Sequence, residues 1–116
     1  MTLQRLHVGD RLSEMAIHHG TVYLAGQVAE DLTGDIGSQT RDVLAAIDRL
    51  LAEAGTDKTR ILMTMIYMKD IREFPAMNAV WDAWVPRGNA PPRATVEAAL
   101  FNPSCLIEIV LTAALP

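Results

Sequence analysis

The sequence predicts an α+β fold in which two helices pack on one face of a mixed β-sheet. Residues 38–54 carry apolar side chains at the three-to-four-residue spacing of an amphipathic helix. Residues 61–68 form a short and almost wholly apolar run, which is typical of a central strand. The other patterns complete the order β-β-β-α-β-α-β-β. A chain of 116 residues suits one domain, and we assign residues 1–116 to it.

Three strands are predicted before the first helix. Residues 3–8, 15–19 and 21–25 carry the strand patterns, and the third is the clearest of them. Gly20 separates the second strand from the third and predicts a tight hairpin, because glycine readily adopts the positive φ angles of such turns. Gly26 ends the third strand.

The first helix has predicted signals at both ends. Residues 31–37 have the composition of a loop, and Ser38 is the expected N-cap. Gly55 stands where a helix C-terminus favours a left-handed residue. The predicted apolar stripe consists of Val43, Leu44, Ile47, Leu50, Leu51 and Ala54.

The second half of the chain predicts a strand, a helix and two further strands. We expect both faces of the strand at 61–68 to be covered. Asp70 is the expected N-cap of the second helix, and Glu73 would complete a capping box with it. The helix ends near Val85. The last strands are predicted at 93–100 and 105–113.

Arg93 is the first candidate site residue. Pro91 and Pro92 fix the backbone just ahead of it, because proline locks φ and biases its predecessor towards extended geometry. A guanidinium presents a fork of donors that matches a carboxylate. The alternative is a surface arginine paired with Glu97.

Glu108 is the second candidate, because it is the one carboxylate in an apolar run. An unpaired carboxylate in apolar surroundings must find a partner, open to a cavity or hold a proton, and such groups suit acid/base chemistry. The alternative is a strand residue that points to solvent or forms an ordinary ion pair. Our hypothesis is that Arg93 and Glu108 face one small pocket, where the arginine binds an anionic substrate and the glutamate handles water.

Composition limits the partners and the compartment. The net charge is −4 without a Lys/Arg-rich block, which argues against nucleic acid as the main partner. Cys105 is the only cysteine, so no internal disulfide can form, and this fits a reducing compartment. No signal-peptide-like start is seen, and no apolar run approaches the ~20 residues of a membrane span. We expect a cytoplasmic protein without a membrane span.

The histidines do not predict a metal site. His18 and His19 are adjacent in a predicted strand, where neighbouring side chains point to opposite faces, so they cannot chelate one ion together. His7 is the only other histidine, and no spaced set of Cys, His and Asp accompanies it.

Two helices can cover only one face of the predicted sheet. The other face would carry apolar side chains of the 61–68 strand, either Met63, Met65 and Tyr67 or their neighbours in the alternate register. An uncovered apolar sheet face favours self-association, so we expect a homo-oligomer.

Several short segments, in their order and spacing, are similar to one known family over nearly the whole chain. They are Ala25-Gly26-Gln27-Val28, Gln39-Thr40-Arg41-Asp42-Val43-Leu44, Ala54-Gly55, Tyr67-Met68-Lys69-Asp70, Phe74-x-x-Met77-Asn78, Pro92-Arg93 and Ile107-Glu108-Ile109. Together they resemble the RidA/YjgF family of reactive-intermediate deaminases.

The resemblance implies a chorismate-mutase-like fold assembled as a homotrimer, with clefts between subunits. It implies hydrolysis of enamine/imine intermediates to 2-keto acids and ammonia, with no metal or organic cofactor. Arg93 would bind the substrate carboxylate, and Glu108 would orient or activate the attacking water. Gly26 and the backbone at Thr95 would line the site.

Three positions differ from those often found in family members with deaminase activity. Ala25 stands where a serine is frequent, and Thr95 where a cysteine is frequent. Arg11-Leu12-Ser13 lies where a Gly-Pro-Tyr segment adds a tyrosine to the cleft. The missing serine and tyrosine favour the alternative hypothesis of a trimer that binds small carboxylates without catalysis.

Overall fold

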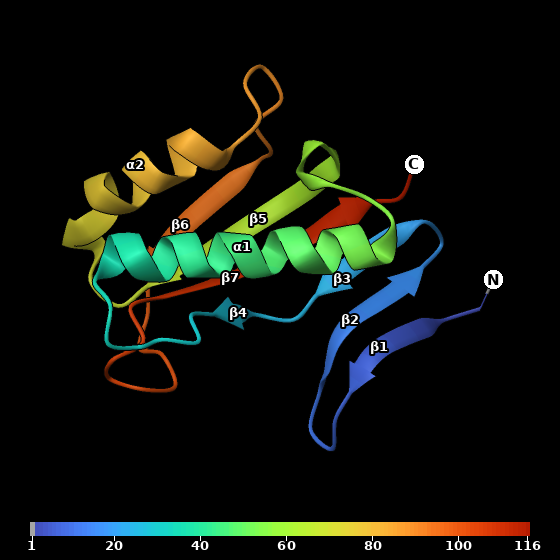
Figure 1. Ribbon diagram of the computed structural model, residues 1–116, viewed down its shortest axis with the longest axis horizontal. Helices are drawn as coiled ribbons and strands as arrows, with labels where there is room; N and C mark the ends of the chain where they lie inside the picture. The colour runs from blue at the N-terminus through green and yellow to red at the C-terminus, as the bar shows by residue number, and fades with distance from the viewer. Residues whose placement is uncertain (1) are drawn as a thin grey trace.

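The computed structural model describes residues 2–116 and has the predicted order of helices and strands, with one short strand added before the first helix (Figure 1). The helices and strands are β1 (Gln4–Val8), β2 (Ser13–His18), β3 (Thr21–Leu24), β4 (Gln27–Val28), α1 (Ile36–Ala54), β5 (Ile61–Met68), α2 (Phe74–Trp84), β6 (Arg93–Glu97) and β7 (Ile107–Ala114). Short 3₁₀ turns, η1 (Lys58–Arg60) and η2 (Ile71–Glu73), precede β5 and α2. The two-residue β4 was not predicted, because so short a strand carries no alternation pattern. None of the helices in this described part is long and apolar enough to cross a membrane.

The sheet is mixed, as predicted. Its strand order is β1-β2-β3-β7-β5-β6, and β4 pairs with β7. Neighbouring strands are antiparallel except β5 and β6, which are parallel. The parallel pair follows from the β5–α2–β6 connection, because a crossover through a helix returns the chain in the same direction.

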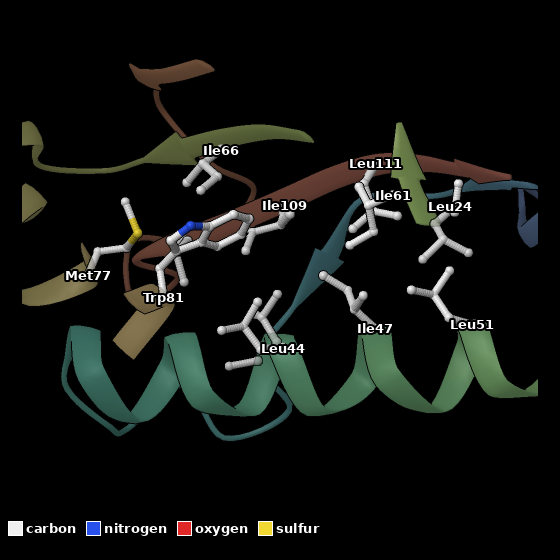
Figure 2. Packing of buried hydrophobic residues seen from close by; sticks show 14 of the residues in the cluster. Leu24, Leu44, Ile47, Leu51, Ile61, Ile66, Met77, Trp81, Ile109 and Leu111 are labelled. Carbon is white, nitrogen blue, oxygen red and sulfur yellow. The ribbon is translucent and has the colours of Figure 1, made fainter. Parts of the chain in front are cut away.

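One face of the sheet is covered by the helices (Figure 1). Leu44, Ile47 and Leu51 of α1 are buried and point towards the sheet, as Figure 2 shows. They meet Ile109 and Leu111 of β7, which are also buried. Burying each such side chain contributes about 1.5–3 kcal/mol, so this layer is the main source of stability.

The opposite face has no helix over it. Within β5 the side chains alternate, and Met63, Met65 and Tyr67 are exposed or half-buried while Thr64 and Ile66 are fully buried. The expectation that both faces of β5 are covered is therefore wrong for a single chain, because α1 and α2 lie on the same side. Met63, Met65 and Tyr67 occupy the uncovered face, in the first of the two predicted registers.

Helix α1 begins earlier than predicted. Asp35, not Ser38, is the N-cap, and its side chain accepts a hydrogen bond of 2.9 Å from the Ser38 amide. A carboxylate three residues upstream of that amide has the reach and the charge that a helix N-terminus favours. The predicted C-terminus is confirmed, because Gly55 has φ 89° and its amide bonds to the Ala52 carbonyl.

The predicted cap of the second helix is partly wrong. Asp70 does cap, but it caps η2, accepting a 3.0 Å hydrogen bond from the Arg72 amide. Helix α2 then starts at Phe74, and Glu73 forms no side-chain cap. Pro75 lies in its first turn, where backbone amides have no carbonyl partner within the helix. The missing N–H of proline therefore costs no helical hydrogen bond there.

Strand ends shift by a few residues, but the hairpin is confirmed. Strand β2 ends at His18, and His19 and Gly20 form the two-residue turn to β3, with φ angles of 51° and 77°. Two positive φ angles define the turn type whose twist fits a hairpin. Strand β6 ends at Glu97 rather than residue 100.

Candidate functional site

Arg93 begins β6 and lies on the covered side of the sheet. Its strand partner is the fully buried Thr64 of β5. The Thr64 amide donates a 3.0 Å hydrogen bond to the Pro92 carbonyl, which ties the stiff proline segment to β5. The start of β6 is therefore tied to β5 on either side of Arg93 Cα, at Pro92 and through the strand pairing, which positions the Arg93 backbone.

The Arg93 side chain is held by one face of α2. Its Nη1 donates to Asn78 Oδ1 at 2.8 Å. Its Cζ lies 5.5 Å from the ring centroid of Phe74 and 5.2 Å from that of Trp81. The alternative pairing with Glu97 is not formed, because Glu97 Oε1 accepts from the Ile71 amide at 3.0 Å.

Glu108 lies on the uncovered face in the middle of the sheet. It is paired with Tyr67 of β5 and Val28 of β4, and it is half-buried. Neither of the ion pairs formed between residues 2 and 116 involves it. The carboxylate is therefore available to a ligand or to water, as the acid/base hypothesis requires.

Gly26 makes room for the Glu108 carboxylate. A Cβ atom at position 26 would lie 2.9 Å from Glu108 Cδ, closer than real Cβ contacts allow. Gln27 fixes this segment, since its buried side chain donates to Glu14 Oε2 at 2.9 Å and to the Ala25 carbonyl at 3.1 Å. Gly26 and Glu108 thus form one local unit.

The four predicted site residues form two groups on opposite faces of the sheet. We call Arg93, Thr95 and Asn78 the cationic half-site, and Gly26 and Glu108 the acidic half-site. In the register, Arg93 and Thr95 pair with Thr64 and Ile66, which face the helices, whereas Glu108 pairs with the outward-facing Tyr67. A single chain does not bring Arg93 and Glu108 into one pocket. Their shared pocket remains a prediction for an assembly of chains.

The contacts of Asn78, Phe74 and Trp81 with Arg93 were not found from the sequence. Phe74 and Asn78 are part of the quoted family segments, but their spacing alone predicted only a helix face. The sequence does place a neutral amide and two aromatic side chains on one face of this helix. That pattern predicts contacts with Arg93 only if β6 is known to lie next to α2.

Two hollows of the described chain include neither Arg93 nor Glu108. A groove of about 490 Å³ runs between α1 and α2, lined by Leu44, Asp48, Lys58, Val80 and Trp84 among others. A second cavity of about 490 Å³ lies between β1, β2, β4 and α1, and Gly26 is the one predicted site residue that lines it.

Cysteine and metal chemistry have little support here. Cys105 is fully buried, and burial raises the pKa of its thiol. Between residues 2 and 116, no group of three or more His, Cys, Asp and Glu side chains is arranged to hold a metal ion.

Known proteins resemble the chain over almost its full length. A family model described as Endoribonuclease L-PSP matches residues 2–115. A RutC family protein from Haemophilus ducreyi is 48% identical over 113 residues, which is 97% of each chain. The RutC family protein YoaB from Escherichia coli is 44% identical and covers 98% of this chain and 99% of its own.

Solved structures agree with these relatives. An uncharacterized protein from Pseudomonas aeruginosa has a TM-score of 0.96 and 42% identity, covering 99% of this chain and 100% of its own. A member of the YjgF protein family from Neisseria meningitidis has a TM-score of 0.96 and 43% identity, covering 100% and 97%. The chain belongs to the YjgF/RidA family, and both the predicted resemblance and the predicted fold are confirmed.

Proposed function

We propose that the protein is a cytoplasmic homotrimer that hydrolyses reactive enamine/imine intermediates to 2-keto acids and ammonia. The observation that carries the proposal is the pair of complementary half-sites. One offers a held guanidinium for a carboxylate, and the other offers an unpaired carboxylate over a glycine. The lone buried Cys105 supports a reducing compartment.

The proposed chemistry needs only water. An enamine first takes a proton from solvent on carbon to become the iminium ion. Glu108 accepts a proton from water as the water oxygen bonds to the iminium carbon, and the C=N electron pair moves to nitrogen, which becomes a neutral amine. That nitrogen then takes the proton back from Glu108. The C–N bond breaks, ammonia leaves, and the hydroxyl group gives its proton to Glu108 as the keto oxygen forms. Arg93 holds the substrate carboxylate throughout, which fixes the imine carbon for attack.

The trimer is proposed because one chain is incomplete. Arg93 lies on the edge strand β6, and Glu108 lies on the uncovered face, so the two could share a pocket only across a contact between chains. The exposed apolar side chains of that face, among them Tyr23, Met63 and Val96, support such a contact. A cyclic assembly would join the cationic half-site of one protomer to the acidic half-site of the next.

Ammonia release from an imino acid, generated in situ by an amino-acid oxidase, tests the activity. We expect acceleration by the wild-type protein, and loss of activity in Arg93→Ala and Glu108→Gln. Unchanged turnover in Arg93→Ala would show that the roles are wrong.

Mixing the two inactive variants tests the shared site. After subunit exchange, a random cyclic assembly restores about one quarter of the sites, because an intact Arg93 then meets an intact Glu108 from the next protomer. If both residues came from one chain, every site would remain defective and no activity would return.

A non-catalytic binder of small carboxylates is the second candidate. Ala25 in place of the frequent serine, and Arg11-Leu12-Ser13 in place of the segment that carries the tyrosine, favour it. Binding of 2-keto acids without acceleration of imine hydrolysis would establish it. Ribonuclease activity, which the description of the family model names, has less support, because the chain has a net charge of −4.

A further inference from the structure

We propose that Asn78 is a positioning residue that aims the Arg93 guanidinium at the substrate carboxylate while leaving its charge intact. The inference rests on the proposed function, and it assigns a role to a residue outside the predicted pair. It starts from the three contacts that α2 makes with one side chain.

Phe74, Asn78 and Trp81 lie at four- and three-residue spacing, so they share one face of α2. All three contact the Arg93 guanidinium, two through aromatic rings at 5.5 and 5.2 Å and one through a 2.8 Å hydrogen bond. The rings restrict the position of the guanidinium, but a ring face offers no directional acceptor. The Asn78 oxygen is what sets the rotation of the group.

The choice of donor matters for ligand binding. A guanidinium has five N–H donors in a planar fork, and a carboxylate is bound best through two parallel hydrogen bonds. With Nη1 engaged by Asn78, the edge formed by Nε and Nη2 has no hydrogen-bond partner between residues 2 and 116. That edge is the one on which we place the substrate carboxylate.

A neutral acceptor is needed for this role. An aspartate at position 78 would also accept from Nη1, but its charge would form an ion pair with Arg93 and compete with the substrate. The asparagine satisfies one donor and leaves the positive charge for the ligand. A residue that served only to pack α2 would not need this distinction.

The test compares Asn78→Ala and Asn78→Asp with the wild type in binding of pyruvate and in imine hydrolysis. For Asn78→Ala we expect the dissociation constant and KM to rise about tenfold with kcat nearly unchanged, because uniform binding is lost. For Asn78→Asp we expect a larger loss, approaching that of Arg93→Ala. Gln4→Glu on β1, at the opposite edge of the sheet from β6, is the matched control for added negative charge.

Equal losses in the alanine and aspartate variants, or a fall in kcat alone, would overturn the inference. Side-chain ¹⁵N NMR of Arg93 gives a second readout that needs no ligand. Rotation of the guanidinium should be slow in the wild type and faster in Asn78→Ala. If the wild type neither binds pyruvate nor hydrolyses imines but the NMR difference is present, the proposed function fails and the positioning contact stands. If rotation is equally fast in both proteins, the positioning role is wrong whatever the activity.

Discussion

At the scale of single residues, Gly26 lies directly beside the Glu108 carboxyl group. The Gly26→Ala side chain would collide with the Glu108 carboxyl group, whose Cδ would lie 2.9 Å from the new Cβ. The clash is with the end of a flexible, half-buried side chain that can turn aside, so we expect a loss of at most about 1 kcal/mol in the free energy of unfolding, below the usual cost of core overpacking. Urea denaturation measures it.

The Glu108→Ala background shows whether that collision is the cause. Removing the carboxyl group should remove most of the cost of Gly26→Ala, which gives a coupling energy in a double-mutant cycle. If Gly26→Ala costs the same in both backgrounds, the close approach does not determine why glycine stands there.

Thr64, the strand partner of Arg93, has a side chain that lowers the stability of the fold. Its hydroxyl is fully buried without a hydrogen-bond partner. Thr64→Val replaces it with a methyl group and should raise the free energy of unfolding by about 1 kcal/mol. Thr40→Val is the matched control, because the buried Thr40 hydroxyl donates to the Ile36 carbonyl at 2.6 Å. Its removal loses that hydrogen bond and should lower the free energy of unfolding. Destabilisation by both changes would contradict the expected difference in sign.

Local sequence patterns identify some of the candidate site residues and not others. Arg93 and Glu108 were found because a proline-led arginine and a lone carboxylate stand out along the chain. Asn78 was not, since an asparagine on a helix gains a role only from the strand that packs beneath it. The placement of the pair on opposite faces depends on the register between β5, β6 and β7, which no local pattern contains.

At the scale of elements, the types of helices and strands were predictable and their ends were not. The apolar period of α1 is strong, so the helix was found, but its start depends on whether Asp35 or Ser38 caps it. Both residue types are good caps, and the backbone decides between them. The capping carboxylates therefore deserve a direct test.

Asp57, which caps η1, gives the pH prediction. Hydrogen bonds from the Thr59 side chain, and then from its backbone amide, lower the pKa of Asp57 below its ordinary value of 3.8. A carboxyl group whose pKa is lowered on folding stabilises the protein above the unfolded pKa, and this is lost as pH falls through the folded pKa. We expect wild type to exceed Asp57→Asn in urea midpoint at pH 6 and the difference to shrink below pH 4. A constant difference from pH 6 to pH 2 would contradict this linkage.

At the scale of the whole molecule, the layered fold followed from counting covered faces. An order of β-β-β-α-β-α-β-β with only two predicted helices leaves one sheet face bare, and the structure has that bare face. The prediction that β5 is covered on both sides was wrong because an apolar run does not say what covers it. An apolar strand face can be covered either by a helix of the same chain or by the surface of another chain, and the apolar side chains it needs are the same in both cases.

If another chain covers the bare face, a charge placed there should disrupt both the assembly and the activity. Met65 lies on the uncovered face, paired with Val110 and Ala94 on neighbouring strands. Met65→Glu should dissociate the proposed trimer, because a charge buried at an interface without a partner costs several kcal/mol. Light scattering coupled to size exclusion measures the assembly, and circular dichroism verifies the fold.

Ala83→Glu, on the exposed face of α2, is the control and should leave the assembly unchanged. The dissociated Met65→Glu protein keeps Arg93 and Glu108, yet we expect it to release no ammonia, since each chain alone holds the two groups on opposite faces of its sheet. A folded monomer with full activity would show that one chain forms the site after all. A Met65→Glu trimer would show that the bare face is not where the chains meet.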